Sequence, residues 1–338
     1  MEWTRGPVIG RGSSATVYLA TTAAGDPFAV KSRELSTSVS LQKEQQILSQ
    51  LNSPNIISYK GYDISYNNNT PMYNLHMEYA PGGTISDTIK KHGGSLDESL
   101  IRSYTHQILL GLDHLHSNNL VHCDIKCQNI LVGENGVKIG DLGCARLVEN
   151  RGGATGTAFS GTPVFMAPEV VRGEEQGFAA DVWALGCVVI EMATGCNPWP
   201  EVDDPISGLY RIGYSGDVPE LPGWLSPEGK DFLAVCLRRD AGERYAVKEL
   251  LRHPFVVKVE EFAKNSPTSV LNQDFWGSLE VPESSPATMH IVDFSGESPF
   301  ERMRQLVKDS PSCLPNWIDE EDWITIRSGH IKESLNIS

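Results

Sequence analysis

One stretch of the sequence decides the fold, and it reads Val121-His122-Cys123-Asp124-Ile125-Lys126-Cys127-Gln128-Asn129-Ile130-Leu131-Val132. A second stretch follows closely, Lys138-Ile139-Gly140-Asp141-Leu142-Gly143. Short apolar and β-branched runs in both favour strands, and polar residues lie beside these runs. The pattern predicts two loops joined by a short hairpin, which is a rigid platform for polar side chains.

Three oxygen-bearing side chains lie within eighteen residues on these two loops, those of Asp124, Asn129 and Asp141. Asn129 and Asp141 offer the hard oxygen atoms that suit Mg²⁺ when it bridges phosphate oxygens. Asp124 offers a carboxylate beside an acceptor hydroxyl, and Lys126 can neutralise charge on a phosphoryl group in transit. These residue types in this order indicate phosphoryl transfer.

A glycine-rich turn precedes them near the N-terminus, Gly10-Arg11-Gly12-Ser13-Ser14-Ala15-Thr16-Val17. Glycines allow backbone N–H groups to approach phosphate oxygens that a Cβ atom would obstruct. An ordinary hairpin has similar glycines, so this turn alone does not separate a nucleotide site from a simple turn. Ala15 also stands where the Gly-x-Gly-x-x-Gly pattern has its third glycine.

The apolar run Phe28-Ala29-Val30-Lys31 ends in one lysine. A lysine at the end of a strand is commonly an exposed surface charge. The functional interpretation makes Lys31 the cation for the α- and β-phosphates, oriented by a carboxylate on a helix. Glu44 is the best candidate for that carboxylate because it lies beside the apolar face of a predicted helix. Glu34 is the rival, although it is too near Lys31 in sequence to be presented by a separate helix.

Short β-rich runs alternate with Gly and Asn turns from Val8 to about Glu78. They are Thr16–Ala20, Phe28–Lys31, Ile57–Gly61 and Asn74–Glu78, with a polar hairpin turn at Asn67-Asn68-Asn69. Three- and four-residue steps predict one helix between the runs Phe28–Lys31 and Ile57–Gly61. Its apolar face carries Leu41, Ile47, Leu48 and Leu51, with Glu44 beside it.

Pro81-Gly82-Gly83 ends this pattern and is a candidate hinge. After it the sequence is mostly helical, and Ala180–Thr194 is apolar nearly all round, which predicts a helix in the middle of a lobe. Another helix is predicted to have one apolar face, with Tyr104, Ile108, Leu112 and Leu115 on it. Residues 256–338 are rich in Ser, Pro, Asp and Glu and predict a largely disordered tail. Within it, Trp317–Ile326 could fold on a partner or dock back onto the domain.

Composition places the protein among soluble globular proteins, with 338 residues of which 40% are hydrophobic. The N-terminus lacks the apolar core of a signal peptide, and the longest apolar run, Val182–Ile190, is too short to span a bilayer. Seven scattered cysteines fit reduced thiols, so we expect a cytoplasmic protein, with entry into the nucleus left open. A net charge of -15 without a basic cluster favours protein partners over nucleic acid or an anionic membrane surface.

Further motifs follow in a fixed order: Met166-Ala167-Pro168-Glu169, Asp181-Val182-Trp183-Ala184-Leu185-Gly186, Arg244 and His253-Pro254-Phe255. With these motifs the chain resembles the eukaryotic protein kinase family over roughly residues 3 to 255. The resemblance implies an α+β fold of two lobes, with a β-rich N-lobe that has one helix (1–79) and a mainly helical C-lobe (80–255). It also implies ATP and Mg as cofactors, and Arg244 as the buried partner of Glu169.

The resemblance assigns roles to individual residues. Asp124 and Lys126 would be catalytic, Asn129 and Asp141 would hold the metal, and Thr162 would hydrogen-bond Asp124 and Lys126. Met77 would be the gatekeeper beside the adenine, and the segment from Glu78 to Ala80 would offer backbone groups to it. The full set of ATP-binding residues would be Ile9, Gly10, Arg11, Gly12, Ser13, Val17, Ala29, Lys31, Glu44, Met77, Glu78 and Ala80.

Two runs refine the resemblance. The chain resembles Ser/Thr kinases in having Lys126 and Gly161-Thr162-Pro163. It looks like the MEKK branch of MAP kinase kinase kinases in two runs, Met77 to Ile85 and Gly161 to Glu169. Small plant members with a short acidic tail match best. A MAP kinase kinase is then the expected substrate, and the alternative is a pseudokinase scaffold in the same cascade. A proline-directed kinase is a candidate partner for the tail, although Ser and Pro are common in disordered tails. Oligomeric state is left open.

Cys123 departs from the family pattern, which usually has an arginine before the catalytic aspartate. In many members that arginine binds a phosphorylated residue of the activation loop. Without it, activity is predicted to depend less on phosphorylation of Thr155, Thr157 or Ser160. Arg146 is a candidate substitute charge.

Overall fold

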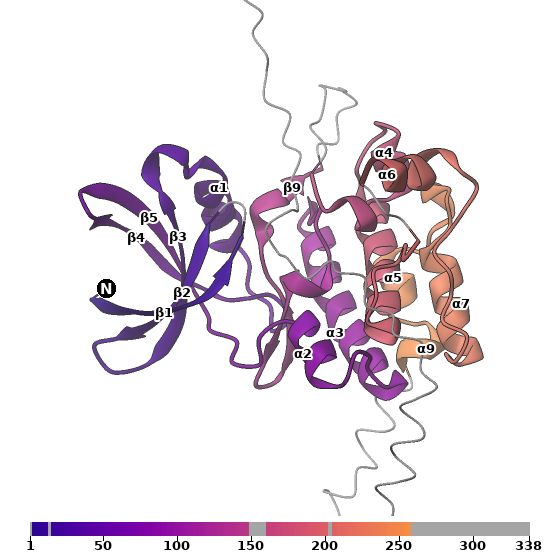
Figure 1. The fold of residues 1–338 in the computed structure, drawn as a ribbon, viewed down its shortest axis with the longest axis horizontal. Helices are drawn as coiled ribbons and strands as arrows, with labels where there is room; N and C mark the ends of the chain where they lie inside the picture. Colours follow the sequence, from indigo (N-terminus) through magenta and orange to yellow (C-terminus); the bar gives the residue numbers. More distant parts are fainter. Residues whose placement is uncertain (1, 13–14, 149–159, 202–204, 258–338) are drawn as a thin grey trace, which may run out of the picture. The chain divides into compact units, whose positions relative to one another are not determined.

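The N-terminal part of the protein is an antiparallel sheet. The computed structural model describes residues 2–12, 15–148, 160–201 and 205–257. The five strands lie in the order β1-β2-β3-β5-β4 (Figure 1). Their bounds are β1 Trp3–Arg11, β2 Thr16–Thr22, β3 Pro27–Glu34, β4 Tyr59–Asn67 and β5 Thr70–Met77. The predicted β-rich N-lobe is therefore confirmed.

Helix α1, Val39–Leu48, lies between β3 and β4 in the sequence, as the apolar spacing predicted. Leu41 and Leu48 are buried in the same core as Leu75 of β5, so the helix packs on one face of the sheet. Glu44 lies on the same side of the helix and is 2% exposed. The amphipathic pattern thus carries a carboxylate into the protein interior.

Strand β4 begins later than the sequence indicated. Ile57 does not pair with the sheet, because its N–H donates to the carbonyl of Ile139 at 2.9 Å. Ile56 forms a parallel bridge with the same residue. The prediction of a strand over Ile57–Gly61 was therefore wrong at its start, because Ile57 binds the C-terminal part of the protein and β4 begins at Tyr59. The predicted turn is confirmed: Asn68 and Asn69 have φ values of 47° and 66°, which suit a tight hairpin between twisted strands.

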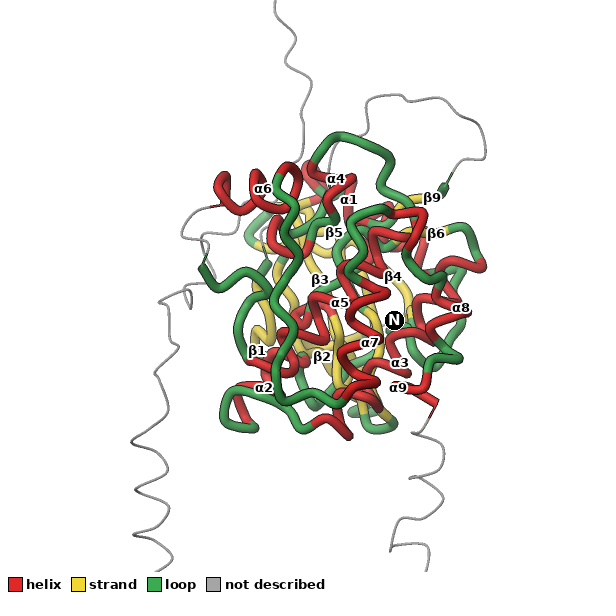
Figure 2. The backbone as a smooth tube through the Cα atoms, turned by 90° about the vertical axis from the view of Figure 1, so that its right-hand side faces the viewer, coloured by secondary structure: helices red, strands yellow, loops and turns green. Residues whose placement is uncertain are grey.

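The C-terminal part is mainly helical and surrounds α5, Phe178–Thr194 (Figures 1 and 2). Trp183, Leu185 and Val188 of α5 are fully buried, as expected for a helix that is apolar on every side. Gly195 ends the helix with φ 70°, a left-handed position that glycine adopts without strain. The other helices are α2 Ile85–Lys91, α3 Glu98–Ser117, α4 Pro168–Val171, α6 Pro205–Tyr214, α7 Pro227–Cys236, α8 Val247–Leu250 and α9 Pro254–Val257.

Two short ladders hold the loops that carry the predicted site. Strands β7, Ile130–Gly133, and β8, Gly136–Ile139, form the hairpin that the sequence predicted. Strands β6, Leu120–Val121, and β9, Arg146–Leu147, pair with each other and flank that hairpin in the sequence. Asp124 therefore lies between β6 and β7, and Asp141 lies between β8 and β9.

Among the described residues four cysteines are buried, Cys123, Cys127, Cys187 and Cys236. Burial raises the pKa of each of these thiols well above its ordinary value. They are therefore protonated and unreactive at neutral pH.

The predicted lobe boundary at residues 79 and 80 falls between the end of β5 at Met77 and the start of α2 at Ile85. The last described helix ends at Val257, and the predicted tail beyond it lies outside the described residues. None of the helices described is both long enough and apolar enough to cross a membrane.

Candidate active site

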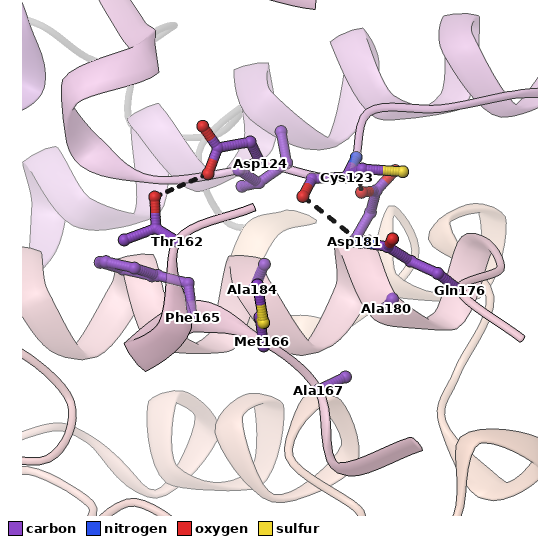
Figure 3. Close-up of a pocket in the computed structure, with 11 residues that line it drawn as sticks. Cys123, Asp124, Thr162, Phe165, Met166, Ala167, Gln176, Ala180, Asp181 and Ala184 are labelled. Carbon is purple, nitrogen blue, oxygen red and sulfur yellow. Dashed lines mark hydrogen bonds between the residues drawn. The ribbon is translucent and has the colours of Figure 1, made fainter. Parts of the chain in front are cut away.

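Asp124 lies on the loop between β6 and β7, and both of its carboxylate oxygens accept hydrogen bonds. Figure 3 shows the bond from Thr162. The hydroxyl of Thr162 donates to Oδ1 at 2.8 Å, and the amide nitrogen of Asn129 donates to Oδ2 at 3.0 Å. The ammonium of Lys126 is 3.2 Å from Oδ2 and donates to the Thr162 hydroxyl at 2.8 Å. The loop and the segment around Thr162 thus fix one carboxylate in one orientation.

Buried hydrogen bonds hold the backbone of this loop. Asp181 of α5 accepts from the N–H of His122 at 2.9 Å and from the N–H of Cys123 at 3.0 Å. Cys123 has φ 67°, a left-handed conformation that a non-glycine residue adopts only when its surroundings hold it there. The ring of His122 bonds the carbonyl of Gly140 at 2.9 Å and accepts from the N–H of Asp124 at 3.2 Å. The imidazole therefore joins the Asp124 loop to the Asp141 loop.

Asn129 and Asp141 meet the chemical requirements of a divalent-cation site. The Asn129 amide nitrogen donates to the carbonyl and the carboxylate of Asp124, so its Oδ1 atom points the other way and can accept a cation. Asp141 has φ 53° and a side chain that is 44% exposed. Among the described residues no group of three or more His, Cys, Asp or Glu side chains could hold a metal by itself. Two oxygen donors fit an ion whose remaining ligands are phosphate oxygens and water.

Lys31 connects the sheet, α1 and the Asp141 loop through two ion pairs. Its ammonium lies 2.8 Å from a carboxylate oxygen of Glu44 and 2.9 Å from one of Asp141. Glu34, the rival partner from the sequence, lies at the exposed end of β3. Loss of hydration would raise the pKa of the Asp141 carboxyl, but the Lys31 ammonium outweighs it and holds the pKa well below its usual range. Asp141 is therefore ionised at neutral pH, as a metal ligand must be.

The first two strands place most of the predicted phosphate-binding residues on one hairpin. Gly10 of β1 pairs with Val17 of β2, and Arg11 pairs with Thr16. The N–H of Gly12 donates to the carbonyl of Ala15 at 3.0 Å, which closes the turn. Ile9 is exposed on β1, and Ser13 lies outside the described residues.

The segment after β5 is the one predicted to face the adenine, and its contacts are with Ser58 and the β7–β8 hairpin. Ala29 of β3 and Met77 of β5 are buried and directly opposite each other in the sheet. The N–H of Glu78 donates to Ser58 at 2.9 Å, and its carboxylate binds Lys138 of β8 at 2.9 Å. The carbonyl of Ala80 accepts from Gly83 at 3.3 Å. The Glu78 side chain is therefore part of a link to the β7–β8 hairpin.

The segment that carries Thr162 is anchored further along by a buried ion pair. Arg244 contacts Glu169 of α4 through two parallel hydrogen bonds of 2.6 and 2.7 Å. The predicted partnership of these two residues is confirmed. Bidentate pairs of this kind restrict both distance and orientation.

Comparison with known proteins agrees with this geometry. The family profile described as protein kinase domain matches residues 3–256. The chain belongs to the protein kinase family. It is 47% identical to mitogen-activated protein kinase kinase kinase 18 of Arabidopsis thaliana over 97% of this chain and 99% of that protein. It is 49% identical to mitogen-activated protein kinase kinase kinase 17 of the same plant, over 83% of this chain and 78% of that protein.

A third relative, mitogen-activated protein kinase kinase kinase 20 of Arabidopsis thaliana, is 39% identical over 97% of this chain and 100% of its own length. The resemblance to small plant kinases of this class is therefore confirmed, and so are the two-lobed kinase fold and the prediction of a protein Ser/Thr kinase. Members of the family use ATP and a divalent metal ion, and this kinase does so as well.

Two residues of this kinase site were not recognised as functional from the sequence. Asp181 was known only as part of the motif for the central helix, although it holds the catalytic loop through two backbone N–H groups. Gln176 carries no charge and belongs to no motif, yet its side chain contacts the catalytic loop. Asp181 could have been found from the rarity of carboxylates in a helix that is apolar nearly all round. Gln176 had no such signal.

Proposed function

We propose that this kinase is a MAP kinase kinase kinase that transfers the γ-phosphoryl group of Mg-ATP to Ser or Thr residues of MAP kinase kinases. The observation that supports it best is the ordered carboxylate of Asp124, held between Thr162, Lys126 and Asn129. The names of the three plant relatives, two of which match nearly the whole chain, support the place in the cascade.

Each of these side chains has a definite task in the transfer. Asp124 accepts a hydrogen bond from the acceptor hydroxyl and aligns it with the phosphorus atom. Lys126 and Lys31 place positive charge where negative charge gathers in the transition state. Glu44 keeps Lys31 in place through a buried ion pair. Mg²⁺ bound by Asn129 and Asp141 would neutralise the phosphate oxygens.

The test is phosphoryl transfer to a panel of kinase-dead MAP kinase kinases, with wild type compared with Asp124→Asn. The amide keeps the size of the side chain but cannot accept the hydroxyl proton, so labelling should fall by roughly a thousandfold. A matched control is Asp113→Asn, a carboxylate of α3 that lies outside the site. Equal labelling by wild type and Asp124→Asn would refute the proposal. Titration with Mg²⁺ and with Mn²⁺ after treatment with chelator would identify the ion.

A pseudokinase scaffold is not favoured, because Lys31, Asp124, Asn129 and Asp141 are all present and held together.

We propose a cytoplasmic location on composition alone, which fractionation of cells would test. The Ser-Pro pairs at Ser266, Ser285, Ser298 and Ser310 are proposed acceptors for a proline-directed kinase, and they lie outside the described residues. Phosphopeptide mapping with and without such a kinase tests this.

A further inference from the structure

Gln176 lies in the connection between α4 and α5, and its side chain reaches the catalytic loop (Figure 3). The residue is 7% exposed. Its amide nitrogen donates to the carbonyl of Ser160 at 2.9 Å and to the carbonyl of Cys123 at 3.4 Å. Three segments that are distant in the sequence therefore meet at one side-chain amide.

A donor of two hydrogens matches this position. Both neighbours are main-chain carbonyls, and a primary amide has two N–H bonds that can serve them together. A buried carbonyl that loses its donor is left without the hydrogen bond it had to water in the unfolded chain, which makes the folded arrangement less favourable. The contact is thus a specific chemical match and not only a matter of filled space.

The backbone at Gly161 passes directly over the same carbonyl. Gly161 has φ 131°, and a Cβ atom built there would lie 2.5 Å from the oxygen of Cys123. The next residue is Thr162, whose hydroxyl bonds both Asp124 and Lys126. Gln176 therefore fixes the chain immediately before the residue that orients the catalytic carboxylate.

Gln176 is itself held by a cation. The guanidinium of Arg146 donates a hydrogen bond to the main-chain carbonyl of Gln176. Arg146 belongs to β9 and is paired with Val121, the strand residue just before the catalytic loop. The charge of Arg146 thus serves to anchor the connection beside Gln176. The buried thiol of Cys123 stays protonated and adds no charge.

We propose that Gln176 is a positioning residue that holds the activation segment against the catalytic loop through neutral hydrogen bonds, so that Asp124 is aligned without a phosphorylated residue. This inference rests on the proposed function, because alignment of Asp124 matters only for phosphoryl transfer. It explains how a kinase with Cys123 in place of an arginine can order the segment around Thr162.

The experiment compares Gln176→Met with Gln176→Ala in the full chain. Methionine keeps most of the volume but cannot donate a hydrogen bond. We expect both variants to show about a tenfold lower kcat for a MAP kinase kinase, with KM for ATP within about twofold of wild type. If the role were packing alone, Gln176→Met would keep the kcat of wild type, and that result would overturn the proposal.

The matched control is Gln107→Met on α3, where the glutamine accepts a hydrogen bond from the N–H of Val137 at 2.8 Å. This variant should lower the melting temperature and leave kcat within about twofold of wild type. A kcat as low as that of the Gln176 variants would show that any lost buried amide has this effect, and it would overturn the specific role.

Amide hydrogen exchange tests the same point on the wild-type protein and does not depend on the folding of any variant. After phosphatase treatment, the amides from Ser160 to Met166 should stay protected, and kcat should fall by no more than about twofold. Rapid exchange over this segment would overturn the proposal even if the variants are inactive. If wild type labels no MAP kinase kinase, the proposed function fails, whereas protection from exchange still reports on the contact of Gln176.

Discussion

The N-lobe side and the C-lobe side of the catalytic centre are held by different kinds of contact. On the N-lobe side, Lys31 joins Glu44 and Asp141 through ion pairs of 2.8 and 2.9 Å. On the C-lobe side, the neutral Gln176 amide joins the activation segment to the catalytic loop, and Arg146 holds Gln176 through its main-chain carbonyl. Gly161 lets the chain pass close to the Cys123 carbonyl. Ion pairs respond to any change in local charge, while hydrogen bonds between neutral groups depend on shape and direction. We therefore expect nucleotide and metal binding to affect the Lys31 ion pairs, whereas the Gln176 hydrogen bonds form without a ligand.

The largest effect should come from removing the cation on the charged side. Lys31→Met leaves Glu44 and Asp141 facing each other without a counter-charge and removes a cation from the phosphates. We expect the single-turnover rate to fall by about a thousandfold. Lys230→Met is a suitable control, because this lysine lies on α7 and donates a hydrogen bond to the carbonyl of Gly223, away from the catalytic residues. A loss of less than tenfold would mean that the ion pairs are not the main support of the N-lobe side.

A smaller loss is expected from Gly161→Ala on the neutral side. The added methyl group would lie 2.5 Å from the Cys123 oxygen, at a φ of 131° that side chains rarely adopt. The segment must therefore shift away from the loop, and a displacement of about 1 Å lowers kcat by about a hundredfold. Gly177→Ala is the control, since a Cβ there meets no atom within 4 Å. Equal rates for the two alanine variants would show that this close approach does not matter.

The smallest effect in the comparison concerns one hydroxyl. Thr162→Val removes the donor to Asp124 and the acceptor for Lys126 while keeping the shape of the side chain. We expect kcat to fall by about tenfold, because the carboxylate keeps Asn129 and loses one bond. Thr162→Ser keeps the hydroxyl and should recover at least half of the rate. If serine were as poor as valine, the methyl group and not the hydrogen bond would be what matters.

The charged side could be predicted from the sequence, and the neutral side could not. The role of Glu44 could be predicted from helical periodicity, because the spacing of the apolar residues in α1 indicates which face of the helix is buried. The Glu169 and Arg244 pair lies in the C-lobe, and as an ion pair between two motif residues it too follows from the motif order. Gln176 depends on the tertiary fold, which brings together residues 16 and 53 positions apart in the chain. No local pattern marks an uncharged side chain whose partners are main-chain carbonyls.

The start of β4 shows the same limit on a smaller scale. The run Ile57–Gly61 has the apolar residues of a strand, but Ile57 bonds the carbonyl of Ile139 in the other lobe. Strand propensity is easily overridden by tertiary contacts of this kind. The order of the elements could therefore be predicted from the sequence, and their bounds only in part.

The four buried cysteines of the described residues can report local opening of the protein, because each becomes accessible to a thiol reagent only when its surroundings open. Cys123 and Cys127 sit at the catalytic loop, whereas Cys187 and Cys236 sit on α5 and α7. A thiol that is buried and protonated can be alkylated only when its surroundings part. Mass spectrometry of the digested protein would give the alkylation rate of each cysteine. The rates of Cys123 and Cys127 would report opening of the catalytic loop, and those of Cys187 and Cys236 would report opening of the helical framework.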